Sequence, residues 1–284
     1  MTASSQRPEA AAGDSDPPRR EHSRRRGAGV PPEVAARLRR APALELRQLV
    51  RDHLTRFSLV DLRQTLLNPF VDGPILDELA GHRELTASRE ARAALARHRR
   101  TSQATAMRLV PTLFWRELAD ITLDTRIRPP VRRVAEKYLL QRLPQLAIGE
   151  RIALARRSAP RTAAELVRDP DARVVAAVLG NPRLREGDVL DAAASRETPA
   201  RLLDVIARDP RFGRRYGVRV ALCRNPSAPF RVLFDLLPTL RHGDLESVTA
   251  VADHAALVRG RAEQLLEARH RHRAGARSRA TIER

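Results

Sequence analysis

The clearest structural pattern in the chain is the stretch Asp169-Pro-Asp-Ala-Arg-Val-Val-Ala-Ala-Val-Leu-Gly-Asn181-Pro182. A short apolar segment of helical character lies between two turns that contain proline, and an Asn-Pro pair closes it. The pair recurs at Asn68-Pro69 and Asn225-Pro226, and His98-Arg99 stands in the equivalent place of a further copy. This recurrence indicates an internal repeat built from short helices.

The residues around each pair repeat as well. Small and apolar residues precede it by three to five positions, at 93–95, 176–178 and 220–222, where they allow a helix to approach its neighbour closely. Apolar residues also follow the first residue of each pair by eleven positions, namely Leu79, Leu109, Ala192 and Leu236. Because a helix with one apolar stripe cannot bury that stripe alone, successive helices are expected to stack.

The same pattern of short apolar segments and proline turns extends over residues 30–269. Five residues follow the spacing of an amphipathic helix: Val131, Val134, Ala135, Tyr138 and Leu139. Thr198-Pro199 and Ala228-Pro229 put proline where a helix begins. We expect about sixteen helices, no strand, and an all-α fold of the α-solenoid type across this range.

A longer duplication overlies the short repeat. Residues 92–140 align without a gap onto residues 219–267, with 15 identities in 49 positions and a shared Pro-Thr-Leu. We interpret this as a duplicated block. Outside the solenoid, residues 1–29 are rich in Arg, Pro and Ser, and residues 270–284 are polar and basic, so both are expected to be disordered tails.

The Asp-Pro to Asn-Pro stretch, together with residues 165–240 around it, resembles the leucine-rich repeat variant, a family similar in appearance to HEAT-like repeats. The resemblance implies alternating α and 3₁₀ helices stacked into a right-handed superhelix. The best-known member of that family also carries an iron–sulfur cluster held by several cysteines. This chain has one cysteine, Cys223, so the cluster is not expected here.

Composition limits the function further. The 284 residues contain 53 Lys+Arg and 34 Asp+Glu, a net charge of +19, and all but Lys137 of these cations are arginine. Such a charge attracts acidic proteins and nucleic acids. Aromatic residues are only 3%, and a lone cysteine excludes a disulfide framework. No secretion signal or span of 18 apolar residues is visible, so we expect a cytoplasmic protein.

The sequence contains no recognisable catalytic, cofactor-binding or metal-binding motif. There is no phosphate-binding glycine loop and no HExxH zinc motif, and we expect no cofactor, no metal and no catalysis. His270 and His272 lie close together without a helper ligand, His98 is interpreted as a turn residue, and Cys223 as a small core residue.

One cluster admits an enzymatic alternative. Trp115 is followed five residues later by Asp120, and certain HEAT-like glycosylases that remove alkylated bases from DNA use an aromatic-lined basic groove and an aspartate. The duplicated copy replaces Phe114-Trp115 by Arg241-His242, which favours a packing role for the tryptophan.

The first hypothesis is therefore a non-catalytic helical-repeat scaffold that binds an acidic protein partner. The second is a solenoid that binds nucleic acid through its backbone phosphates, and the glycosylase is the third. The candidate contacts for an acidic partner or for phosphate are Arg97, Arg99, Arg100, Arg214, Arg215 and Arg224.

Overall fold

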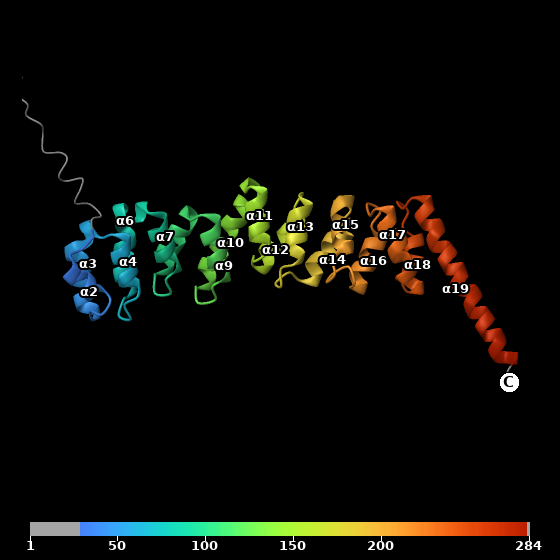
Figure 1. Cartoon of the computed structure of the whole chain (residues 1–284), viewed down its shortest axis with the longest axis horizontal. Helices are drawn as coiled ribbons and strands as arrows, with labels where there is room; N and C mark the ends of the chain where they lie inside the picture. Colours follow the sequence, from blue (N-terminus) through green and yellow to red (C-terminus); the bar gives the residue numbers. More distant parts are fainter. Residues whose placement is uncertain (1–28, 283–284) are drawn as a thin grey trace, which may run out of the picture. The chain divides into compact units, whose positions relative to one another are not determined.

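The protein is described by a computed structural model that covers residues 29–282 (Figure 1). Within this range all regular structure is helical and no strand occurs. The chain divides into two compact units, Met1–Leu113 and Phe114–Arg284. The expectation of an all-α protein is confirmed, with eighteen α-helices in the described range where about sixteen were expected.

Unit 1 contains short helices joined by tight turns. Its helices are α2 (Pro32–Leu38), α3 (Ala43–His53), η1 (Leu54–Arg56), α4 (Leu59–Leu66), α5 (Gly73–Gly81), α6 (Arg83–Ala87), α7 (Arg89–Arg97), α8 (Gln103–Leu109) and η2 (Val110–Thr112). Helix α2 contacts α4, α3 contacts α5, and α4 contacts α7. The core between them is aliphatic, with Leu46, Leu62, Ile75 and Leu95 all fully buried.

Unit 2 is organised in the same way. Its helices are α9 (Trp115–Leu123), α10 (Pro129–Arg142), η3 (Leu143–Gln145), α11 (Ile148–Ala155), α12 (Pro160–Leu166), α13 (Ala172–Leu179), α14 (Glu186–Ala194), α15 (Ala200–Arg208), α16 (Tyr216–Arg224), α17 (Phe230–Leu236), η4 (Leu237–Thr239), α18 (His242–Thr249) and α19 (Ala256–Ile282). Here α11 contacts α13, α13 contacts α15, and α14 contacts α16. Several helices of this unit thus pack on the helix two places further along.

The Asn-Pro turns hold neighbouring helices together. The side chains of Asn68, Asn181 and Asn225 are almost fully buried. Each amide Nδ2 donates to two carbonyl oxygens of an earlier turn, at 2.8 to 3.1 Å, and each Oδ1 accepts the backbone N–H two residues later. A buried amide that makes all these bonds satisfies backbone groups that packing removes from water.

The helices in the two blocks of the proposed duplication begin at equivalent positions. Helices α7, α8 and η2 match α16, α17 and η4 residue for residue at an offset of 127, and α9 and α10 begin 127 residues before α18 and α19. This agreement supports the interpretation drawn from the 15 identities.

The structure describes most of the C-terminal tail but almost none of the N-terminal tail. Residues 1–28 lie outside the described range, and with them nearly all of the N-terminal segment expected to be disordered. At the other end the expected disorder is not confirmed, because the structure describes α19 as continuing through Ile282. Residues 270–282 are rich in Arg and Ala, both of which favour helix.

Candidate functional site

Three successive turns of unit 2 meet at one edge, which is formed by the C-terminal ends of α11, α13 and α15. Asn181 Nδ2 donates to the Ala155 carbonyl oxygen at 2.8 Å and to the Ser158 carbonyl oxygen at 3.1 Å, which joins the first turn to the second. The Arg211 guanidinium donates to the carbonyl oxygens of Asn181 at 2.9 Å and Leu184 at 3.2 Å, which joins the second to the third.

Arginine is concentrated on these turns. Residues 156–161, 181–188 and 208–215 contain only three carboxylates, Glu186, Asp188 and Asp209. We call the arginines of the three segments the arginine edge: Arg156, Arg157, Arg161, Arg183, Arg185, Arg208, Arg211, Arg214 and Arg215, all of them exposed. Nine cations against three anions on adjoining turns create a strongly positive surface.

Four members of the arginine edge are engaged within the protein. Arg157 pairs with Asp120 at 2.8 Å, and Arg208 pairs with Asp204 at 3.2 Å. Arg215 lies 3.7 Å from Glu186, and Arg211 bonds the two carbonyl oxygens given above.

The other five make no side-chain hydrogen bond or ion pair to the part of the chain that the structure describes. These are Arg156, Arg161, Arg183, Arg185 and Arg214. Arg161 acts at longer range, where its charge counters the rise in the pKa of Glu136 that burial causes. The edge therefore offers five exposed guanidinium groups to a partner.

A glycine makes the third turn possible. A Cβ at Gly213 would lie 2.1 Å from the Ala207 carbonyl oxygen and 2.8 Å from that of Asp209, so no larger residue fits without movement of the backbone. Phe212 beside it is buried, with the Arg211 guanidinium 4.5 Å from its ring centroid. The turn is thereby anchored while Arg214 and Arg215 remain at the surface.

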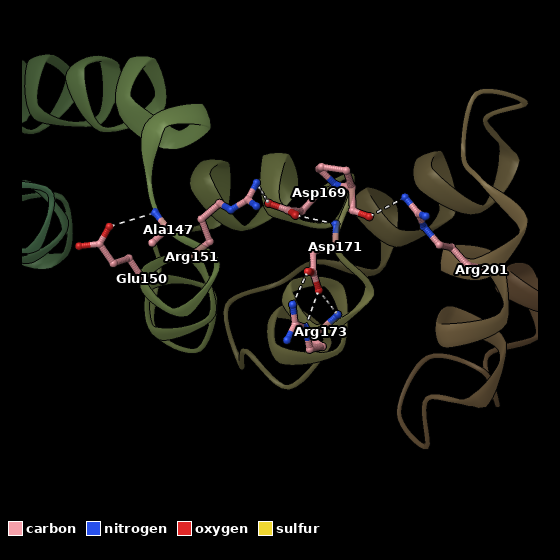
Figure 2. Close-up of polar contacts among 8 residues, drawn as sticks. Ala147, Glu150, Arg151, Asp169, Asp171, Arg173 and Arg201 are labelled. Atoms are coloured by element: carbon pink, nitrogen blue, oxygen red, sulfur yellow. Dashed lines mark hydrogen bonds and ion pairs between the residues drawn. The ribbon is translucent and has the colours of Figure 1, made fainter.

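The opposite edge of unit 2 is also rich in arginine, but its arginines bind groups of the protein itself (Figure 2). Arg173 pairs with Asp171 at 2.8 Å and lowers the pKa of that carboxyl to about 2. Arg151 pairs with buried Asp169 at 3.1 Å, and Arg201 donates to the Pro170 carbonyl oxygen at 3.0 Å. The open hollow of about 450 Å³ between these residues is thus lined by cations that already have partners.

The six arginines predicted from the sequence lie on separate surfaces. Arg214 and Arg215 belong to the arginine edge, whereas Arg224 lies near the opposite edge and bonds Ser247 Oγ at 2.8 Å and Asp244 at 3.2 Å. Arg97, Arg99 and Arg100 belong to unit 1. Arg97 makes contacts of its own, and Arg100 donates to the carbonyl oxygens of Pro69 and Val71, both at 2.6 Å.

Four of the five arginines without partners were not among the predicted contacts: Arg156, Arg161, Arg183 and Arg185. One signal was present for Arg183. It follows its turn residue by two positions, as Arg100, Arg126 and Arg211 do, and its backbone N–H donates to the side chain of that turn residue, as theirs do. An arginine at this register is held at the outside of a turn by its own backbone.

The other residues that the sequence singled out for possible chemistry are buried or contact other side chains of the protein. Trp115 is only 4% exposed, and its Nε1 donates to Glu150 Oε1 at 2.9 Å, while Asp120 is held by Arg157. Burial raises the pKa of the Cys223 thiol to about 12. His270 lies edge-on to His242, with ring centroids 4.8 Å apart. Among the described residues no three His, Cys, Asp or Glu side chains are grouped so that they could hold a metal ion.

None of the helices in the range 29–282 is both long and apolar enough to cross a membrane. No protein-family model, no curated protein and no solved structure matches this chain.

Proposed function

We propose that this protein is a non-catalytic helical-repeat scaffold and that the arginine edge binds an acidic macromolecule. The observation that carries the proposal is the set of five exposed guanidinium groups without partners in the described chain, on three turns joined by hydrogen bonds. The opposite edge supplies the contrast, since the arginines drawn there are already paired (Figure 2).

The proposal includes the architecture expected from the sequence, a right-handed α-solenoid of HEAT-like or leucine-rich-repeat-variant type. It is supported by the packing of several helices on the helix two places along, among them α3 on α5, α11 on α13 and α13 on α15, and by the recurring Asn-Pro bonds. In such a stack the same turn position recurs at one edge, so side chains from successive repeats form a row suited to an extended ligand.

An acidic protein is the first candidate partner. Arginine binds carboxylates through two parallel hydrogen bonds, and Arg173 and Asp171 show this geometry within the chain, with Nε at 3.1 Å and Nη2 at 2.8 Å from the two carboxylate oxygens. A segment with several Asp or Glu residues would therefore match the five free guanidinium groups.

A nucleic acid is the second candidate, and one observation favours it. None of the large exposed apolar side chains of the described residues lies in the three segments of the arginine edge. Protein interfaces usually contain apolar anchors, whereas a phosphate backbone requires only cations. No exposed aromatic ring lies on the edge to stack with single-stranded bases, so binding would depend on the backbone phosphates.

Two triple variants with the same change in charge test the proposal. Arg183→Gln, Arg185→Gln and Arg214→Gln together alter the arginine edge, and Arg168→Gln, Arg173→Gln and Arg201→Gln together alter the opposite edge. Fluorescence anisotropy at several salt concentrations would compare a labelled 20-residue glutamate-rich peptide with a labelled 20-base-pair duplex.

We expect the affinity of the first triple variant to fall roughly tenfold or more and its salt dependence to become shallower. The second triple variant should keep an affinity close to that of the parent chain. The better-bound probe identifies the partner class. Equal losses in both variants, or no binding of either probe at low salt, would refute the arginine edge as the binding surface.

A further inference from the structure

A second surface, in unit 1, combines exposed apolar side chains with arginine. Leu44 is 80% exposed, Leu67 is 62% exposed and Phe70 is 53% exposed. We call these three residues the apolar patch. They are among the most exposed large apolar residues of the described chain, and a partner that covered them would bury apolar surface.

The three residues lie on α3 and on the turn that Arg47 of α3 reaches. Leu67 and Phe70 belong to the single turn after α4, where the Phe70 N–H donates to Asn68 Oδ1 at 2.7 Å. Leu44 lies three residues before Arg47 on α3, so both project from one face of that helix. Arg47 reaches this turn, where it pairs with Asp72 at 2.7 Å.

Arginines flank this turn on both sides. Asn68 Nδ2 donates to the carbonyl oxygens of Leu38 and Ala41, which places the turn that carries Arg39 and Arg40 next to it. On the other side, Arg100 donates to the carbonyl oxygens of Pro69 and Val71, which places the turn that carries Arg99 and Arg100 there.

The flanking charge is not cancelled locally. The nearby carboxylates are already used, since Glu45 pairs with Arg37 and Asp72 with Arg47. The guanidinium groups of Arg39, Arg40 and Arg99 form no hydrogen bond or ion pair to any described residue. The apolar patch thus lies between two positively charged turns.

The fold does not require apolar residues at these positions. Equivalent turns have Arg97 or Arg224 in place of Leu67, and Arg183 or Ser227 in place of Phe70, and they keep the same asparagine or histidine bonds. The exposure of Leu67 and Phe70 therefore has no structural reason within their own turn.

We propose that the apolar patch and its flanking arginines dock an acidic peptide segment that carries a large apolar side chain. The apolar side chain contacts Leu44, Leu67 and Phe70, and carboxylates on either side of it contact Arg39, Arg40 and Arg99. An aliphatic surface has no counterpart on a sugar–phosphate backbone, whereas aromatic and aliphatic anchors ringed by charge are typical of protein interfaces. The inference concerns a different unit from the arginine edge and does not depend on it.

Three labelled probes test this inference on the full chain by fluorescence anisotropy. The first is a 12-residue glutamate- and aspartate-rich peptide with leucine and phenylalanine at its centre, and the second has alanine at both central positions. The third is a 12-nucleotide oligothymidine. The variant Leu67→Ser with Phe70→Ser removes most of the apolar patch. Val60→Ser is its control, because Val60 is also 62% exposed but stands at the other end of α4.

We expect the first peptide to bind about tenfold or more tightly than the second, since only the first removes large apolar side chains from water on binding. The double variant should lose that difference, and Val60→Ser should keep it. Arg40→Gln with Arg99→Gln should weaken both peptides. Equal binding of the two peptides, unchanged binding by the double variant, or stronger binding of oligothymidine that is lost with Phe70 would overturn the inference. A failure of the arginine-edge variants would leave these results unaffected.

Discussion

The Asn181 side-chain amide donates a hydrogen bond of 2.8 Å to the carbonyl oxygen of Ala155, the last residue of α11. The bond crosses from the turn after α13 to the end of the helix two places earlier. The chain contains three asparagines, and all three make this type of bond, at Asn68, Asn181 and Asn225. Asparagine suits the position because one small side chain supplies both a donor and an acceptor without charge.

Replacement of Asn181 by alanine is expected to lower the free energy of unfolding by about 3 kcal/mol, because it leaves buried carbonyl oxygens without their donor. Urea titration followed by circular dichroism measures the loss. Gln103→Ala is the matched control, since Gln103 is an exposed amide in α8 and its removal should cost little. A loss for Asn181→Ala no larger than the control would show that the amide is dispensable.

His98 replaces asparagine in the fourth turn of this type and makes the stability of the protein sensitive to pH. Its Nδ1 accepts the Arg100 N–H at 3.3 Å, and the ring also bonds the Leu66 backbone. Burial lowers the pKa of His98 below its ordinary value of 6.5, and the nearby Arg100 and Arg99 charges lower it further. The unfolded chain therefore binds the proton more readily than the folded one.

Stability should accordingly be complete above pH 6.5 and fall as the pH drops below that value toward the lowered pKa of the folded state. Unfolding free energies measured between pH 7.5 and pH 5 would show the trend. His98→Asn, which restores the residue of the other turns, should reduce the slope over this range. An unchanged slope in that variant would place the pH dependence elsewhere, for example at His254, whose pKa burial also lowers.

The sequence predicted the turns well, but it did not predict which arginines would form ion pairs. The Asn-Pro pair acts through local chemistry. Asparagine and proline each restrict the backbone of the turn, and each has the same effect in every copy of the repeat. The recurring pair therefore predicted helices, turns and the core position of Cys223 correctly.

The partners of each arginine could not be predicted in the same way. Arg47, Arg63 and Arg231 each pair with a carboxylate that lies 25 to 27 residues away, on another helix or on the turn before it. Whether an arginine is free depends on helix rotation and turn length, which the residue pattern does not specify. Arg183 and Arg224 both flank an Asn-Pro pair, yet only Arg224 forms an ion pair with an aspartate.

Gly213 and Gly187 provide a matched pair for backbone space. Gly213→Ala is expected to destabilise the protein by about 2 kcal/mol or more, because its Cβ would lie 2.1 Å from the Ala207 carbonyl oxygen. At Gly187 a Cβ meets nothing within 4 Å, so Gly187→Ala in α14 should be neutral or stabilising by up to about 1 kcal/mol. Thermal melts compare the two. Equal tolerance at both sites would mean that the turn at 209–215 rearranges readily.

Arg211 and Arg214 lie in one turn of the arginine edge. Substitution of the first should affect mainly stability, and substitution of the second should affect mainly binding. Arg211 bonds the Asn181 and Leu184 carbonyl oxygens and covers Phe212, so Arg211→Ala is expected to cost about 1–2 kcal/mol of unfolding free energy. Arg214 has no such contact, and Arg214→Ala should leave unfolding unchanged while it weakens binding of the acidic probe. Urea titration and anisotropy on the same samples would measure both effects. If Arg214→Ala destabilised the fold as much as Arg211→Ala, its guanidinium would not be free for a partner, and the case for the arginine edge as a binding surface would weaken with it.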